Sequence, residues 1–82
     1  MSVQQQLTEE MAVAAVNEVL GNKRQRWEPV DASASLEQLD LDSLEVAELF
    51  ATLEDRSGLE LDPDSARELE TVGDLARIRP LD

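Results

Sequence analysis

Ser43 is the side chain whose type and position in this sequence best suit a covalent attachment. It follows Asp42 and precedes Leu44 at the predicted start of an amphipathic helix. The first amides of a helix lack partners within the helix, and the helix dipole is positive there, so an anion is stabilised at that end. A phosphodiester on the Ser43 hydroxyl would therefore be well placed. Considered alone, however, the tripeptide is better explained as a helix cap, because Asp and Ser are preferred capping residues.

Conventional catalysis is not expected, because the chain contains no cysteine and no histidine. Their absence removes the thiolate nucleophile, the usual general base and the common zinc ligands. Two acidic segments, starting at Asp40 and at Asp62, begin like calcium-binding loops. Their sixth positions hold Glu45 and Arg67, where such a loop requires glycine, so no metal site is predicted.

The charge of the chain indicates which partners it can have. Acidic residues number 19 against 7 basic ones, which gives a formal net charge of -12. Nucleic acid and anionic membranes would repel such a molecule, so we expect basic proteins as partners. The basic run at 23–26 is explained as a solvated loop or as an internal charge partner. No apolar run is long enough to span a membrane and residues 1–6 do not resemble a leader, so a cytoplasmic location is expected.

Two stretches have the apolar spacing of amphipathic helices. The first covers about 8–20, with Thr8 as a suitable cap and Gly21-Asn22 as the predicted end. The second covers about 43–57, where Gly58 can end it. The apolar positions expected to face the core are Met11, Ala12, Ala15, Val16, Val19 and Leu20 in the first stretch, and Val46, Leu49, Phe50 and Leu53 in the second.

The remaining segments complete the predicted fold. Residues 22–41 show no sustained period and form a long loop, a short helix is expected at 65–69, and a last helix follows a cap at Thr71 and stops before Pro80. The sequence therefore predicts an all-α fold, a small four-helix bundle of three main helices and one short helix with a long loop between helices one and two. We expect residues 1–82 to form a single domain with its core at about 7–79. The loop residues expected to pin the loop to the core are Trp27, Val30, Leu36 and Leu39.

The segment around Ser43 resembles the phosphopantetheine attachment site of acyl carrier proteins. The resemblance rests on residues 39–49, Leu-Asp-Leu-Asp-Ser-Leu-Glu-Val-Ala-Glu-Leu, on the preceding long loop, on the helix end at 53–55 and on residues 71–75, Thr-Val-Gly-Asp-Leu. It extends over about residues 7–79. It implies a non-catalytic carrier with 4'-phosphopantetheine attached covalently to Ser43, which makes the chain a phosphoprotein. It also implies that Asp42 engages the modifying transferase near its magnesium and that Leu44 is an exposed partner contact.

One side of the predicted helix 43–57 mixes small apolar residues with carboxylates. By itself this pattern is explained as the solvated face of an acidic helix. Beside a serine that carries the arm, it is better explained as a docking face for enzymes that bind briefly. The expected partners are a phosphopantetheinyl transferase and loading or condensing enzymes such as a ketosynthase, an acyltransferase or an acyl-activating ligase. We expect the chain itself to be a monomer. The predicted docking residues are Leu44, Glu45, Ala47, Glu48, Ala51 and Asp55.

Several positions bear on the pathway. Asp40 stands where the family often has glycine, and Ser57 stands where fatty-acid carriers often have an aromatic residue. Leu36 lies seven residues before Ser43, a spacing closer to polyketide-type carriers. These features favour polyketide or other secondary-metabolite biosynthesis over fatty-acid biosynthesis. The alternatives are a peptidyl or aminoacyl carrier and, in a different class, an acidic helical adaptor with an unmodified Ser43.

Overall fold

The computed structural model describes residues 7–81, and residues 1–6 and 82, including the segment considered above as a leader, lie outside this range. The described part is built from helices and contains no β-strand beyond two isolated bridges. The all-α prediction is confirmed, but the four-helix count is not, because residues 7–81 form three α-helices and two 3-10 helices. These elements are α1 (Glu9–Lys23), α2 (Leu36–Leu39), α3 (Ser43–Ser57), η1 (Pro63–Ala66) and η2 (Gly73–Arg77).

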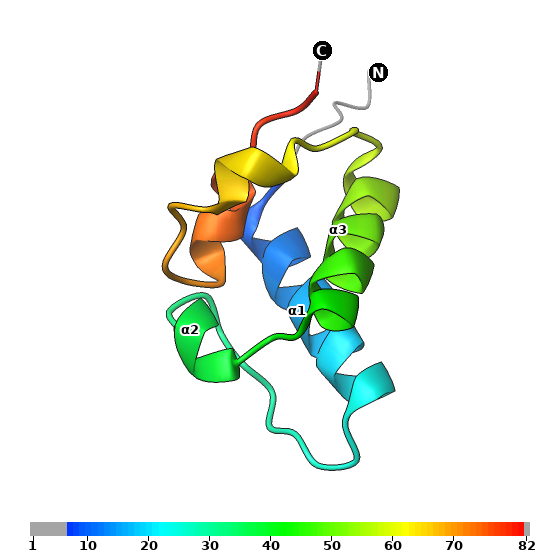
Figure 1. Ribbon diagram of the computed structural model, residues 1–82, viewed down its shortest axis with the longest axis vertical. Coiled ribbons are helices and arrows are strands. Elements are labelled where there is room, and N and C mark those ends of the chain that lie inside the picture. The colour runs from blue at the N-terminus through cyan, green and yellow to red at the C-terminus, as the bar shows by residue number, and fades with distance from the viewer. Residues whose placement is uncertain (1–6, 82) are drawn as a thin grey trace.

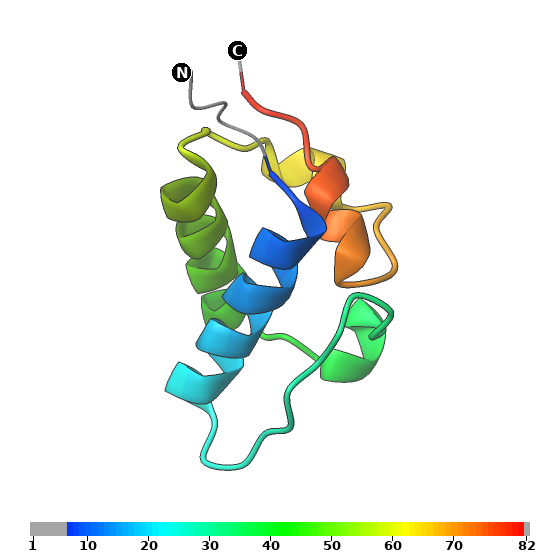
Figure 2. The same ribbon diagram turned by 180° about the vertical axis from the view of Figure 1, so that it is seen from behind.

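Helices α1 and α3 run in opposite directions beside one another and form the body of the molecule (Figure 1). Viewed from behind, α1 lies between α3 on one side and η2 on the other (Figure 2). The apolar faces of these elements meet in one core, which removes them from water. No helix within residues 7–81 is both long and apolar enough to cross a membrane. The buried core residues are Ala12, Ala15, Val16, Val19, Leu20, Leu49, Leu53, Leu61, Val72, Leu75 and Ile78.

Helix α1 begins as predicted but ends later. The Thr8 hydroxyl accepts a hydrogen bond from the Met11 amide at 3.2 Å, which confirms it as the cap. The predicted stop at Gly21 is wrong, since the helix continues to Lys23. Gly21 does not end the helix but allows the Trp27 ring to pack closely against it, since a Cβ at this position would lie 3.1 Å from the ring. Trp27 therefore covers the last turn of α1 and is 39% exposed, instead of entering the core as expected.

The segment before α3 is not a free loop. Val30, Leu36 and Leu39 pack against the core, as predicted, and the last two belong to the short helix α2. Asp40 then ends α2 in the left-handed region, with φ at 51°. Glycine suits this conformation best and Asp tolerates it, so Asp40 meets the backbone requirement of the position where the family often has glycine.

Backbone hydrogen bonds tie the segment 32–36 to the segment 70–73, and we call this contact the loop seam. The amides of Gly73 and Val72 donate to the carbonyls of Ala32 and Ala34 at 2.8 and 2.9 Å, and the Leu36 amide donates to the Glu70 carbonyl at 2.9 Å. These bonds order a connection that would otherwise be costly in so small a domain.

The two helices predicted near the C-terminus are shorter and tighter than expected. The first begins at Pro63, two residues before the predicted start, because the Asp62 carboxylate accepts the Asp64 amide at 3.0 Å and proline fits a first helical turn. The second is only the five-residue η2. The predicted cap at Thr71 lies one residue before the observed N-cap, Val72, and the Thr71 hydroxyl accepts the Asp74 amide at 3.2 Å. Such short pieces commonly adopt 3-10 geometry.

Candidate functional site

Ser43 is the first residue of α3, and its side chain is exposed. The residue before it caps the helix: Asp42 Oδ1 accepts the Glu45 amide at 2.7 Å, while Glu45 Oε1 accepts the Asp42 amide at 3.1 Å. This reciprocal capping box satisfies two amides that the helix cannot satisfy itself. The choice between capping by Asp42 and by Ser43 is therefore resolved in favour of Asp42.

The Ser43 hydroxyl has no hydrogen-bond partner among residues 7–81. A serine used to stabilise the fold would normally hydrogen-bond to the backbone nearby, as Ser35 does when it caps α2. An exposed and unengaged hydroxyl at the positive end of a 15-residue helix can take a phosphodiester without losing an internal contact. The residues present at this position therefore fit attachment of a phosphate-linked group.

Glu45 was predicted to belong to the docking face, and the structure contradicts this prediction. Its side chain is only 6% exposed and forms an ion pair with Arg24, with 2.8 Å between Glu45 Oε2 and Arg24 Nε. The hydrogen bonds from Arg24 hold the pKa of the Glu45 carboxyl below its ordinary value. Glu45 is thus an internal anion and is not available to an incoming enzyme.

The inward position of Glu45 also corrects the predicted core face of α3. The buried positions along this helix are 45, 49, 53 and 57, which repeat every four residues. Val46, expected in the core, is instead 39% exposed, because Glu45 and its partner Arg24 occupy the inner side of the first turn. Apolar spacing could not show this, because such a pattern assigns charged residues to the outside.

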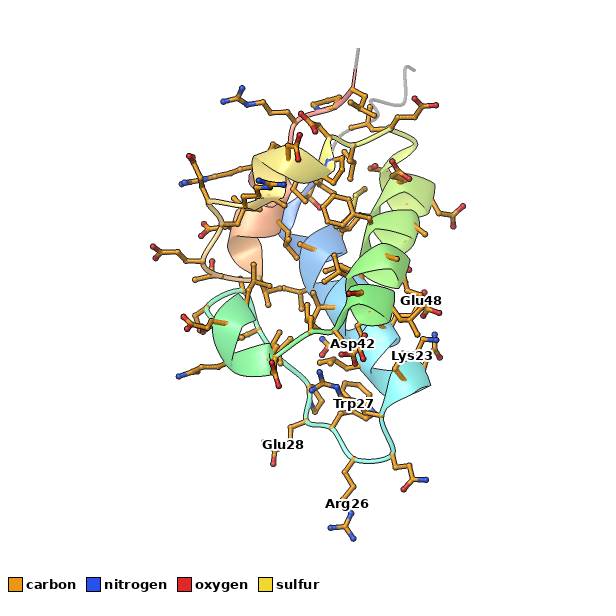
Figure 3. All side chains as sticks on the ribbon, viewed as in Figure 1. Lys23, Arg26, Trp27, Glu28, Asp42 and Glu48 are labelled. Carbon is orange, nitrogen blue, oxygen red and sulfur yellow. The ribbon has the colours of Figure 1, made fainter. Side chains whose placement is uncertain are left out.

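The other acidic residues of α3 differ in availability. Glu48 pairs with Lys23 at 2.8 Å, and the two side chains point toward one another at the end of α1 (Figure 3). Glu54 Oε2 accepts the Leu61 amide at 2.9 Å. Asp55 is exposed and forms no ion pair within the described part of the chain. Most carboxylates of the predicted docking face are therefore already engaged.

Small apolar side chains dominate what remains of this face. Leu44 is 69% exposed, and Ala47 and Ala51 are also exposed, three and seven residues further along α3. This spacing places the three on one side of the helix, next to Ser43. We call Leu44, Ala47 and Ala51 the apolar stripe.

Two residues of the basic run at 23–26 form ion pairs with acids of α3. Lys23 and Arg24 both pair with acids of α3, so the explanation of the basic run as an internal charge partner is confirmed for them. Arg26, in contrast, points away from the bundle at the tip of the loop (Figure 3). The sequence contains a signal for these ion pairs: two basic residues follow the first predicted amphipathic helix, and acids stand at the start of the next one. Together the fold and the site define a small helical domain that presents an exposed serine at the start of a long helix.

Comparison with known proteins agrees with this class. A family model described as a phosphopantetheine attachment site matches residues 10–78. An acyl carrier protein of Chlamydia trachomatis serovar D is 42% identical over 45 residues, which are 55% of this chain and 58% of the relative. An acyl carrier protein of Chlamydia muridarum is 38% identical over 47 residues, which are 57% of this chain and 61% of the relative. The chain thus matches less than two thirds of either relative's length, and no solved structure matches it significantly.

Because the family model matches most of the chain, the chain belongs to the family of the phosphopantetheine attachment site. The resemblance noted in the sequence is confirmed, and so is the inference that this domain is a carrier and not an enzyme. The group that it carries is a covalently attached 4'-phosphopantetheine.

Proposed function

We propose that this domain is an acyl carrier whose 4'-phosphopantetheine arm is attached to Ser43. The observation that carries the proposal is the exposed Ser43 hydroxyl, which heads α3 without an internal partner because Asp42 provides the cap. Once attached, the arm supplies a terminal thiol that holds acyl groups as thioesters. The chain itself presents the hydroxyl, stabilises the phosphate through the positive end of α3 and keeps the site open to solvent.

Asp42 has a second role in this proposal, as the acid that the modifying transferase engages near its magnesium. One oxygen, Oδ1, is occupied by the cap. The other oxygen, Oδ2, takes part in no hydrogen bond with residues 7–81, and the residue is exposed. A carboxylate held in place by the helix cap, on an exposed residue and with one oxygen free of hydrogen bonds to residues 7–81, is suited to a hard cation presented by a partner.

The docking surface that we propose is the apolar stripe of Leu44, Ala47 and Ala51, flanked by Glu48 and Asp55. Glu45 no longer belongs to it, because that residue is buried. Small apolar contact areas release quickly, which suits a monomeric carrier that visits several enzymes. The proposed partners are a phosphopantetheinyl transferase and loading or condensing enzymes such as a ketosynthase, an acyltransferase or an acyl-activating ligase, all in the cytoplasm.

We place the carrier in polyketide or related secondary-metabolite biosynthesis rather than in fatty-acid biosynthesis. The spacing of Leu36 before Ser43 supports this, and Leu36 starts α2 and packs against the core. Ser57, which stands where fatty-acid carriers often have an aromatic residue, is buried and accepts the Leu59 amide at 3.2 Å. A peptidyl or aminoacyl carrier is the alternative within the same family.

Acyl carriage is tested by loading the chain with an acyl-coenzyme A through a broad-specificity transferase. We expect intact mass to increase by one acyl-phosphopantetheine group and hydroxylamine to release the acyl portion, because hydroxylamine cleaves thioesters. An adduct that resists hydroxylamine would exclude thioester carriage. If the folded chain gained no mass, the adaptor with unmodified Ser43 would replace the carrier.

The docking surface is tested by comparing two variants of exposed residues on α3. Leu44→Asp should raise the transferase KM about tenfold, because it places a charge in the apolar contact. Asp55→Asn should change KM by about twofold at low salt and less at high salt, since a single rim charge mainly steers encounter. An unchanged KM for Leu44→Asp would remove the stripe from the interface.

A further inference from the structure

Arg24 stands where α1 ends and the long connection to α3 begins. Its backbone amide closes the last turn of α1 by donating to the Leu20 carbonyl at 3.0 Å. Its side chain is 32% exposed, and its guanidinium reaches across to the segment that carries Ser43. The side chain therefore links the end of one main helix to the beginning of the other.

The guanidinium holds both sides of the Asp42-Ser43 pair. After the serine, Nε and Nη2 donate to the two carboxylate oxygens of Glu45 at 2.8 and 2.9 Å, a bidentate contact. Before the serine, Nη2 also donates to the carbonyls of Leu39 and Asp40 at 2.8 and 3.3 Å. We call these four hydrogen bonds the Arg24 clamp.

The clamp is continuous with the cap of α3. Glu45 Oε1 accepts from Arg24 and also accepts the Asp42 amide, while Asp42 Oδ1 returns a bond to the Glu45 amide. One network thus runs from Arg24 through Glu45 to Asp42, so it joins a residue after Ser43 to the residue before it. Because Glu45 is buried, loss of Arg24 would leave a carboxylate without its counter-ion, and the first turn of α3 would have to rearrange.

The ion pair between Arg56 of α3 and Glu18 of α1 offers a matched comparison for the Arg24 clamp. Arg56 Nη2 lies 2.8 Å from Glu18 Oε1, the same separation as in the clamp. Both partners are about as exposed as a typical surface pair, at 40% and 45%, and Arg56 lies in the last turn of α3, remote from Ser43. A surface pair of this kind contributes little, so its loss should leave Ser43 in place.

We propose that Arg24 is a positioning residue for modification: its clamp fixes the Ser43 hydroxyl relative to the docking surface on α3. The proposal rests on attachment at Ser43. A transferase that docks on the apolar stripe then meets the hydroxyl in one orientation, and a small misplacement of a reacting atom is costly in rate.

The first test uses the unmodified chain and needs no transferase. Arg24→Ala should raise amide hydrogen exchange about tenfold at Asp42, Glu45 and Val46, whose amides are bonded within the capping network, while exchange in the centre of α1 changes little. Arg56→Ala should leave these three amides unchanged. Equal acceleration throughout α1 and α3, or none at the three amides, would overturn the proposal.

The second test measures transfer to Ser43. With Arg24→Ala we expect kcat to fall about tenfold while KM stays within about twofold, because Ala47 and Ala51 lie beyond the first turn of α3 and keep their places, whereas the hydroxyl is misplaced. Arg24→Lys should restore little, since an ammonium cannot form the bidentate contact. A normal kcat despite faster local exchange would make the clamp purely structural. If Arg24→Ala does not fold, Glu45→Gln is measured in the same way.

The two tests separate failure of this inference from failure of the proposed function. If the wild-type chain is not modified at all, attachment at Ser43 is wrong, yet the exchange comparison still reports whether the clamp holds this segment. If the wild type is modified and Arg24→Ala is modified at the same rate, attachment stands and the positioning role is lost.

Discussion

At the residue scale, Asp42 combines a cap and a charge that substitution can separate. Asn caps helices as well as Asp, so Asp42→Asn should change the free energy of unfolding by less than about 0.5 kcal/mol, whereas Asp42→Ala should lower it by about 1 kcal/mol. Both should slow phosphopantetheine transfer, because both remove the carboxylate. Urea unfolding and transfer kinetics measure the two effects. Full-rate transfer to Asp42→Asn would show that the transferase does not use this charge.

Glu45 gives the molecule a specific dependence on pH. Its pKa in the folded chain lies below the ordinary value of 4.5, because Arg24 stabilises the carboxylate. Its contribution to stability is therefore fully present above about pH 4.5 and is lost as the pH falls through the lower folded pKa. At neutral pH we expect Glu45→Gln to lower the free energy of unfolding by about 2 kcal/mol.

Urea unfolding of wild type and Glu45→Gln across this pH range measures the effect directly. The difference between the two should be constant above about pH 4.5 and should shrink as the pH decreases further, since the wild-type carboxylate becomes protonated. A difference that grows on acidification would contradict the ion pair with Arg24.

The sequence could predict Ser43 but not the environment that holds it. Serine, the acid before it and the helix start are local features, so a motif identifies them. Arg24 lies 21 residues from Glu45 along the chain, and no helical spacing links them. Asp40 gave partial information about the backbone before Ser43. It stands where the family often has glycine, and the structure shows this position in the left-handed region.

At the scale of elements, the bounds of a helix were predicted correctly where residues next to its ends set those bounds. The bounds predicted for α3 are confirmed because both ends are set locally, by the Asp42 cap and by Gly58, whose φ is 73°. The end predicted for α1 was wrong because Gly21 is used for contact with Trp27, which the sequence does not reveal. The last two helices were predicted too long because pattern reading does not separate 3-10 turns from α-helix.

The loop seam can be tested at Gly73. A Cβ at this position would lie 3.1 Å from both the carbonyl oxygen and the Cβ of Ala32, so Gly73→Ala should push the two segments apart. We expect the free energy of unfolding to fall by about 2 kcal/mol, the usual effect of overpacking. Ala14→Gly on the half-buried outer side of α1 is a control for helix propensity alone and should cost about 1 kcal/mol. An unchanged midpoint for Gly73→Ala would show that the seam yields easily.

At the scale of the whole molecule, the net charge of -12 opposes folding through self-repulsion. Each of the ion pairs between α1 and α3 removes some of this repulsion, but most acids have no basic partner to meet. Raising NaCl from about 0.02 to about 0.5 M should therefore increase the free energy of unfolding, by about 1 kcal/mol, because salt screens charges that lie beyond the Debye length. Urea midpoints at several salt concentrations measure this. A decrease with salt would mean that the ion pairs outweigh the repulsion.

The fold class follows from the apolar spacing of two long helices, and the carrier family follows from the residues around Ser43. The prediction that residues 1–82 form one domain stays a prediction, as do the cytoplasmic location and the monomeric state. What pattern could not supply is the set of contacts between distant segments, namely the Arg24 clamp and the loop seam, which together hold the serine at one end of the bundle.

The most direct test of attachment at Ser43 is fragment mass analysis of the chain after incubation with coenzyme A and a broad-specificity transferase. We expect one phosphopantetheine group, located on Ser43 in wild type and in the control Ser33→Ala, which removes another exposed serine. Ser43→Ala, folded by circular dichroism, should gain nothing. A group found on any other residue, or no gain in the folded wild type, would contradict the account.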